Sequence, residues 1–140
     1  MKINSTKFNN IVNLLRDLSE TSDMLHRHAC ALVLGGKIVA MGINTYVRNS
    51  KHAEINAIEN FIKREKEKLL KRCILIVIRL GRDGEVQSSK PCSTCVPIIK
   101  QYGIKRVFYS VQRGFEFEKG DNIQSTHLTL SKKLEILGKL

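Results

Sequence analysis

Hydrophobic positions near the start of the chain recur every three or four residues, the spacing of one face of a helix. They are Phe8, Ile11, Val12, Leu14, Leu15 and Leu18. Two apolar runs follow, over residues 31–34 and 38–43, with Gly35 and Gly36 between them. Tight hairpin turns require positive φ, which glycine adopts without strain. The pattern therefore predicts an amphipathic helix followed by a β-hairpin.

A second helix is predicted from near His52 toward Leu70, with Asn49 or Ser50 as its N-cap. Its expected buried face consists of Ile55, Ile58, Phe61 and Ile62. Residues 73–80 form an apolar run rich in β-branched side chains, which is typical of a central strand covered on both faces. Residues 81–90 read as a loop.

The remaining elements are a third helix, two strands and a last helix. Pro91 suits the first position of the third helix, and Gly103 suits the position after its end. Residues 106–110 and 115–117 predict two strands joined by a turn, and residues 131–140 a C-terminal helix. The order predicts an α/β fold of three α-β-α layers with a mixed five-stranded sheet.

Composition bounds the class of protein. With 140 residues, 42% of them hydrophobic, the chain fits one soluble domain over residues 1–140. No apolar run reaches membrane-spanning length, and the first residues lack the pattern of a secretory signal. We therefore expect a cytoplasmic location, with the nucleus as the alternative.

The formal charge of +11 favours anionic partners such as nucleotides or nucleic acid. The basic run between Lys63 and Arg72 is interpreted as a solvated helix face.

Two short segments carry the candidate chemistry, and each begins a predicted helix. Cys92 and Cys95 follow Pro91 at a spacing that puts both sulfurs on one helix face. With His52 they form a donor set suited to zinc, and three protein ligands leave the fourth position open, as in catalytic sites. Cys30 and Cys73 lie in apolar runs and are expected to be buried free thiols.

Glu54 stands two residues after His52, too close for both to be equally good ligands from one helical turn. Its better use is as a base that takes a proton from the water at the open zinc position and passes it to the reacting groups. The alternative is a closed structural zinc site with His127 or Cys30 as fourth ligand. His26 and His28 are expected at the surface.

The triplet His52-Ala53-Glu54 and the motif Pro91-Cys92-Ser93-Thr94-Cys95 together match the signature of zinc deaminases. On these motifs the chain resembles the cytidine deaminase-like zinc superfamily, from about residue 28 to residue 110. The residues around His52 look most like the deoxycytidylate and tRNA-adenosine deaminase branches. The short link between residues 110 and 115, in contrast, predicts an antiparallel hairpin as in the free-nucleoside branch.

The resemblance implies that His52, Cys92 and Cys95 bind zinc and that Glu54 moves protons. It also implies that backbone groups near Ala53 and Lys90 contact the base, that Asn44 hydrogen-bonds the sugar or base, and that the protein forms dimers or larger assemblies. Tyr46, Phe115 and Phe117 are candidates for stacking on a base, with Tyr46 favoured. Lys51, Lys90 and Arg48 either rim the pocket and attract a phosphate or are solvated loop residues.

Three functions follow. The first is hydrolytic deamination of a cytosine base in cytidine, deoxycytidine or their monophosphates, a role in nucleotide metabolism. The second is editing of cytosine or adenosine in RNA or single-stranded DNA, which the positive charge favours. The third is a non-catalytic nucleic-acid-binding protein stabilised by zinc.

Overall fold

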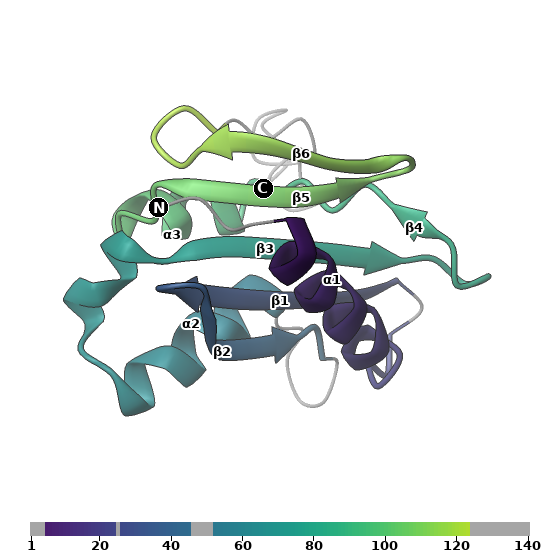
Figure 1. Ribbon diagram of the computed structural model, residues 1–140, viewed down its shortest axis with the longest axis horizontal. Coiled ribbons are helices and arrows are strands. Elements are labelled where there is room, and N and C mark those ends of the chain that lie inside the picture. The colour runs from purple at the N-terminus through teal and green to yellow at the C-terminus, as the bar shows by residue number, and fades with distance from the viewer. Residues whose placement is uncertain (1–4, 25, 46–51, 124–140) are drawn as a thin grey trace, which may run out of the picture.

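The computed structural model describes residues 5–24, 26–45 and 52–123, and Figure 1 shows their arrangement. The elements in chain order are α1 (Ser5–Ser19), β1 (Arg27–Leu34), β2 (Lys37–Ile43), α2 (Ala53–Arg64), the 3₁₀ helix η1 (Glu67–Arg72), β3 (Ile74–Leu80), β4 (Val86–Gln87), α3 (Cys95–Gln101), β5 (Arg106–Val111) and β6 (Gly114–Lys119).

The strands form one mixed sheet in the order β2-β1-β3-β5-β6, with the short β4 paired to the end of β3. β3 and β5 are parallel, and the other pairs are antiparallel. The α/β architecture predicted from the sequence is confirmed, but within the described residues the sheet has six strands rather than five. The additional strand spans two residues, Val86 and Gln87. It is too short to leave a period-two signal, so the sequence predicted only a loop.

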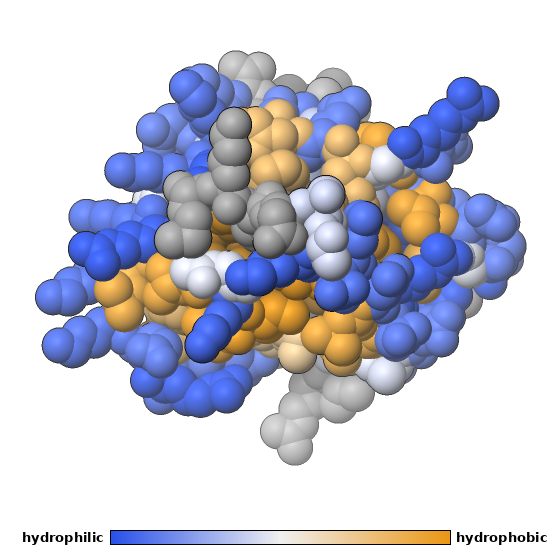
Figure 2. Space-filling view, in the orientation of Figure 1, coloured by the Kyte–Doolittle hydropathy of each residue, from blue (hydrophilic) through white to orange (hydrophobic). Residues whose placement is uncertain are grey.

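Helices cover both faces of the sheet and complete the three layers. Ile74, Ile76 and Ile78 of β3 are buried on the side of α1. Leu75 and Val77 are buried on the opposite side, with residues of α2 and α3. The apolar run of β3 lacks polar alternation because both of its faces are covered. Figure 2 shows the face with α1, where apolar side chains lie between polar ones at the rim. Among the described residues, no helix combines the length and apolarity needed to cross a bilayer.

The first hairpin turns at Gly35 and Gly36, with φ of 60° and 79°. This confirms the turn predicted from the two glycines. The first strand begins earlier than its apolar run, at Arg27. Its first two residues, Arg27 and His28, are polar and only partly buried, so hydrophobicity alone placed the start of the strand four residues too late.

The second helix differs from its predicted bounds at both ends. Its N-cap is His52 rather than Asn49 or Ser50, and His52 makes no capping hydrogen bond through its side chain. The helix stops at Arg64, and Glu65 is extended, with ψ of 163°. The basic run that follows is exposed, as predicted, but it continues in the separate helix η1.

The second half of the chain follows the predicted order. β5 and β6 form the expected antiparallel hairpin. The third helix begins at Cys95 and not at Pro91, because residues 93 and 94 form a turn. The expected helix over residues 131–140 lies outside the described residues.

Close packing of α2 on β2 depends on Gly42. A Cβ at this position would lie 2.4 Å from the backbone nitrogen of Ala57 and 2.6 Å from the carbonyl oxygen of Ala53. Both atoms belong to helix backbone, which cannot rotate away as a side chain can. Gly42 thus sets how closely the first turn of α2 approaches the sheet.

We expect Gly42→Ala to destabilise the fold by about 1–3 kcal/mol, the usual range for overpacking. The physical reason is that α2 must move off β2 to admit the methyl group. The measurement is the urea midpoint of unfolding. Lys37→Ala, at an exposed position of the same strand, serves as the control and should stay within about 0.5 kcal/mol of the wild type. Equal midpoints for all three proteins would contradict this account of the packing.

Candidate metal centre

The imidazole of His52 and the thiols of Cys92 and Cys95 meet where α2 and α3 begin. His52 Nδ1 lies 3.4 Å from Cys92 Sγ and 3.3 Å from Cys95 Sγ. All three ligand atoms lie within 4.8 Å of one another. The structure therefore brings together the three residues that the sequence predicted as ligands.

The donor set fits zinc in both chemistry and spacing. Tetrahedral zinc, with Zn–S of about 2.3 Å and Zn–N of about 2.0 Å, would separate nitrogen from sulfur by about 3.5 Å. The two distances between His52 and the sulfurs are close to that value. Within residues 5–24, 26–45 and 52–123, no further His, Cys, Asp or Glu joins the group. His127, one alternative fourth ligand, lies outside these residues.

Each ligand is fixed by the local structure around it. His52 precedes α2, and its carbonyl oxygen accepts the N–H of Asn56 at 3.1 Å. The carbonyl oxygen of Cys92 accepts the N–H groups of Cys95 and Val96, at 3.1 and 3.0 Å. These bonds begin the two helices, so the ligands are held by backbone hydrogen bonds and not only by side-chain packing.

The surroundings favour a thiolate at Cys92. A hydrogen bond from the Cys95 thiol, with further bonds from His52 and the backbone N–H groups of Thr94 and Cys95, lowers the pKa of Cys92 to about 3. The hydrogen bond to Cys92 raises the pKa of His52. Thiolate is the form that binds metal, so the pocket stabilises Cys92 in its binding state. The hydrogen bond from Cys95 to Cys92 raises the pKa of Cys95 itself, which holds its proton as the donor.

Glu54 lies in the first turn of α2 and is 5% exposed. Burial raises the pKa of its carboxyl group. Its side chain is hydrogen-bonded to that of Cys95, which places the carboxylate beside the three candidate ligands. A buried carboxylate with this location can accept and release a proton near neutral pH more readily than a solvated one.

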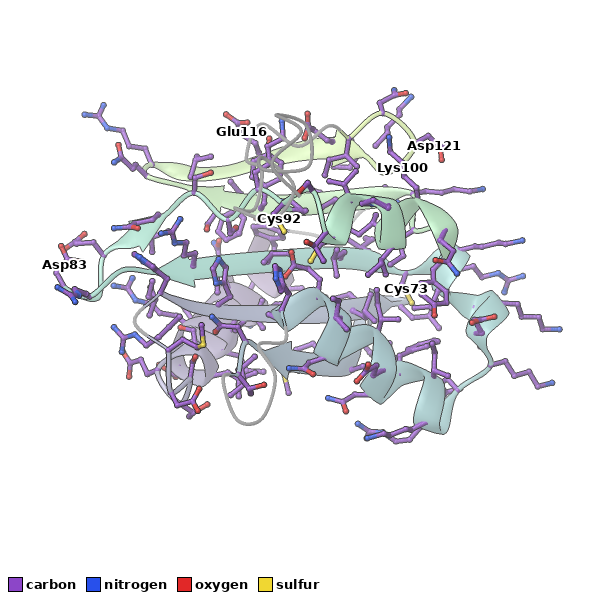
Figure 3. All side chains as sticks on the ribbon, turned by 180° about the vertical axis from the view of Figure 1, so that it is seen from behind. Cys73, Asp83, Cys92, Lys100, Glu116 and Asp121 are labelled. Atoms are coloured by element: carbon purple, nitrogen blue, oxygen red, sulfur yellow. The ribbon has the colours of Figure 1, made fainter. Side chains whose placement is uncertain are left out.

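The two remaining cysteines are buried free thiols, as predicted. Burial raises the pKa of Cys30 well above its usual range, with a smaller contribution from the charge of Glu54. Cys73 lies away from Cys92, toward the other end of the sheet (Figure 3). Neither belongs to the candidate metal group, so the alternative with Cys30 as fourth ligand finds no support in this geometry.

A pair of buried serines fixes the segment that leads to Cys92. Ser89 and Ser110 are 3% and 0% exposed, and their hydroxyl groups are 2.8 Å apart. Ser89 Oγ donates to the carbonyl of Val77 at 2.8 Å, and Ser110 Oγ donates to that of Gln87 at 2.7 Å. The pair ties residues 87–89 to the ends of β3 and β5. The sequence does not reveal the pair, because two serines separated by 21 residues leave no local pattern.

His28 also lies nearer the site than predicted. It is partly buried in β1, and burial, then the charge of Arg79, then that of His52 lower its pKa to about 4. His26 is exposed, as expected. The period-two alternation of Cys30 and Leu32, both facing α2, was the signal that could have placed His28 on the same face.

The predicted substrate-binding residues have different surroundings. Ala53 is buried at the start of α2. Asn44 is 7% exposed; its Oδ1 accepts from the backbone N–H of His28 at 2.8 Å and from Ser22 Oγ at 2.8 Å, and its Nδ2 donates to the carbonyl of His26 at 2.6 Å. It thus braces residues 22–28, and its contact with a substrate stays a prediction.

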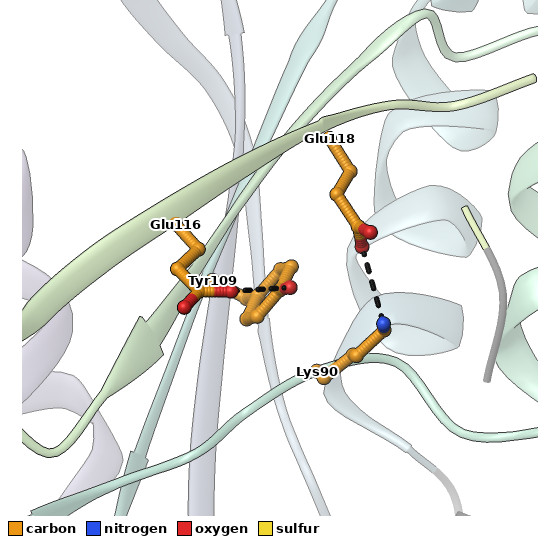
Figure 4. Close-up of polar contacts among 4 residues, drawn as sticks. All are labelled: Lys90, Tyr109, Glu116 and Glu118. Atoms are coloured by element: carbon orange, nitrogen blue, oxygen red, sulfur yellow. Dashed lines mark hydrogen bonds and ion pairs between the residues drawn. The ribbon is translucent and has the colours of Figure 1, made fainter. Parts of the chain in front are cut away.

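Lys90 does not extend freely into solvent. Its Nζ lies 3.5 Å from Glu118 Oε2 and 5.9 Å from the centroid of the Tyr109 ring, while the Tyr109 hydroxyl donates to Glu116 at 2.9 Å (Figure 4). The lysine charge is therefore paired within the protein. Its predicted backbone contact with the base stays a prediction.

The aromatic candidates on β6 lie on the wrong face of the sheet. Phe115 packs edge-on against Phe8 of α1, with ring centroids 5.2 Å apart, and Phe117 contacts Phe108 at 5.0 Å. These rings face α1, whereas the candidate metal centre lies on the side of α2 and α3, so their proposed stacking on a base is wrong. Tyr46, Arg48 and Lys51 lie outside the described residues.

Comparisons with known proteins agree with this geometry. Residues 4–111 match the family model described as the cytidine and deoxycytidylate deaminase zinc-binding region. The fold is similar to that of a cytidine deaminase from Burkholderia pseudomallei, with a TM-score of 0.68 and 14% identity over 85% of this chain and 97% of that one.

A second similar structure is a diaminohydroxyphosphoribosylaminopyrimidine deaminase/5-amino-6-(5-phosphoribosylamino)uracil reductase from Thermotoga maritima. The TM-score is 0.54 and the identity 23%, over 73% of this chain and 28% of that longer chain. No curated protein sequence is significantly similar to this one.

We expect Cys92→Ser or His52→Ala to weaken zinc binding by at least about 100-fold, since loss of a residue that merely supports a ligand already costs about 10–100-fold. The measurement is zinc per chain after dialysis against a chelator. Cys73→Ser is the matched control, because it alters a buried thiol outside the site. Full zinc retention by Cys92→Ser, or equal loss by Cys73→Ser, would refute the ligand assignment.

Proposed function

This chain belongs to the cytidine and deoxycytidylate deaminase family of zinc-binding proteins, and on that basis we propose that it converts a cytosine base to uracil by hydrolysis and releases ammonia. The substrate class is cytidine, deoxycytidine or their monophosphates. The observation that carries the proposal is a buried carboxylate, Glu54, beside a His-Cys-Cys donor set. In this proposal residues 1–140 act as one catalytic domain.

His52, Cys92 and Cys95 hold the zinc ion in this mechanism. Zinc supplies Lewis acidity that makes water a nucleophile near neutral pH. The two cysteines contribute negative charge and His52 a neutral donor. The three residues come from two separate helix starts, so the ligand geometry depends on the packing of both helices on the sheet.

Glu54 moves the protons. It takes one proton from the attacking water and delivers it to the ring nitrogen, then takes the remaining proton from the new hydroxyl group on the ring carbon and delivers it to the leaving amine. As the carbon–oxygen bond forms at the ring carbon, the carbon–nitrogen bond to the amino group breaks, so one water is consumed for each ammonia released. Burial of Glu54 supports this role, because it brings the pKa of the carboxyl closer to the pH at which the reaction runs.

A second candidate is the deamination of bases within RNA or single-stranded DNA. The formal charge of +11 favours it. Much of the basic run near the end of α2 is exposed and available to a polyanion. A mononucleotide needs few such contacts, so the two substrates differ in how strongly salt affects them.

We expect Glu54→Gln to lower the rate of deamination by about 10²–10⁴-fold, the usual contribution of general acid–base catalysis. The zinc content should stay equal to that of the wild type, because Glu54 is not a ligand in this proposal. Glu59→Gln, at an exposed position of the same helix, is the control. A rate of deamination unchanged by Glu54→Gln would refute the role of Glu54, whereas absence of deamination in the zinc-loaded wild type would favour the zinc-stabilised, non-catalytic alternative.

Salt dependence separates the two substrate classes. We expect activity on a nucleoside or its monophosphate to change less than about threefold between 50 and 200 mM salt, whereas a polynucleotide making 6–10 phosphate contacts loses about 10³–10⁵ in affinity over that range. Ammonia release from cytidine, its monophosphate and a cytosine-containing oligonucleotide is the measurement. Turnover of the oligonucleotide alone, with steep salt dependence, would overturn the small-substrate proposal.

A further inference from the structure

Two asparagines set the alignment of α2 along β2. Asn60 Nδ2 donates to the carbonyl of Met41 at 2.8 Å, and Asn56 Nδ2 donates to that of Ile43 at 2.6 Å. The start of α2 therefore lies beside the end of β2. His52 lies one turn before Asn56, at the level of Asn44.

A row of residues crosses the sheet at this level. The backbone N–H of Asn44 donates to the carbonyl of His28 at 3.3 Å, and His28 is the register partner of Arg79. Cys30 and Val77, the pair next to it on the same face, are buried beneath α2 and α3. Because side chains alternate along strands, His28 and Arg79 share that face. They lie in front of the two helix starts, on the side of the metal centre.

Two contacts orient the guanidinium of Arg79. Its Nη2 lies 2.9 Å from His26 Nδ1, and its Nη1 donates to the carbonyl of Ser88 at 3.5 Å. Asn44 bonds to the backbone of both His26 and His28, so the backbone that carries the His26 ring is braced. Neither acceptor is a carboxylate. These contacts orient the guanidinium without neutralising its charge.

The hydrogen-bonding capacity of Arg79 is not filled by these contacts. A guanidinium has five N–H donors, and Nε is buried without a partner among the described residues. An oriented arginine with spare donors matches the planar, bidentate recognition of phosphate. Lys90, the other cation expected at the site, is paired with Glu118 instead.

We propose that Arg79 is a specificity-determining residue that binds the phosphate of a nucleoside monophosphate, so that the substrate is a nucleotide rather than a free nucleoside. This inference rests on the proposed deamination at the same site. The location of Arg79 at the carboxyl end of β3, where α/β sheets usually bind ligands, supports it. The low pKa of His28 keeps its ring neutral beside Arg79, so the row carries a single strong positive charge.

The experiment compares zinc-loaded wild type with Arg79→Gln and Arg79→Lys on cytidine and cytidine monophosphate. Loss of a charge-assisted hydrogen bond of this kind corresponds to a loss of affinity of about 10–100-fold. We expect Arg79→Gln to lower kcat/KM for the monophosphate by that factor, mainly through a higher KM. The kcat/KM for cytidine should change less than about threefold. Arg79→Lys should recover part of the loss. Arg82→Gln, at an exposed position three residues away, also removes one positive charge and should leave kcat/KM for both substrates unchanged.

A second readout does not need turnover. Calorimetry with the products, uridine monophosphate and uridine, should show that wild type binds the monophosphate at least about tenfold more tightly and that Arg79→Gln removes this difference. Thermal unfolding of each variant confirms that it is folded. An Arg79→Gln variant that fails to fold leaves Arg79→Lys, which preserves the charge but not the bidentate geometry, to test the same preference.

The outcomes separate the two proposals. Equal losses on both substrates in Arg79→Gln, equal binding of the two products by wild type, or the same loss in Arg82→Gln would overturn the assignment of Arg79 while deamination stands. Zinc-loaded wild type that releases no ammonia from any cytosine compound would overturn the proposed function. The calorimetric comparison would then still decide whether Arg79 binds the phosphate.

Discussion

The approach of α2 to the sheet at Gly42 is the constraint on which the candidate site depends. Without a side chain at that position, backbone atoms of Ala53 and Ala57 lie where a Cβ would be. The first turn of the helix is therefore held against β2, and His52 precedes that turn. A displacement of about 1 Å at this contact would exceed the tolerance of a metal site, in which ligand distances vary by only about 0.2 Å. The geometry of the metal ligands therefore depends directly on the contact of α2 with β2.

The other half of the site is fixed by polar groups instead of close backbone packing. Ser89 and Ser110 are buried with their hydroxyl groups in contact, and they donate to the backbone carbonyls of Val77 and Gln87. Hydrogen bonds are directional, so they specify where the segment before Cys92 runs more sharply than apolar contacts would. An apolar core on one side and a satisfied polar pair on the other thus hold the two helix starts at a fixed separation.

The order of elements and the ligand set could be predicted from the sequence because their signals are local. The apolar run of β3, the two glycines of the hairpin and the motifs at His52 and Cys92 each lie within a few neighbouring residues. The confirmed parts of the fold, and the spatial meeting of the three ligands, follow from these patterns. Even the antiparallel β5–β6 hairpin was readable from its short link.

What the sequence did not reveal depends on contacts between distant positions. Phe115 and Phe117 are two positions apart on one strand and so share a face of the sheet. Only the pairing of β6 with β5 decides which face this is. Lys90 has a partner 28 positions away, in Glu118. His28 was expected at the surface because the polar start of β1 gives no hydrophobic signal, although its neighbour Cys30 is fully buried.

The same non-local contacts determine how charge is distributed at the site. A cation near a metal centre can serve the fold or the ligand, and the difference lies in its partners. Lys90 has a carboxylate partner, and this ion pair links the loop to the β5–β6 hairpin. Arg79 is held by a ring nitrogen and a carbonyl oxygen, which fix its direction and leave its charge in place. Two basic residues near the same motif therefore differ in kind, and the sign of the net charge alone could not have distinguished them.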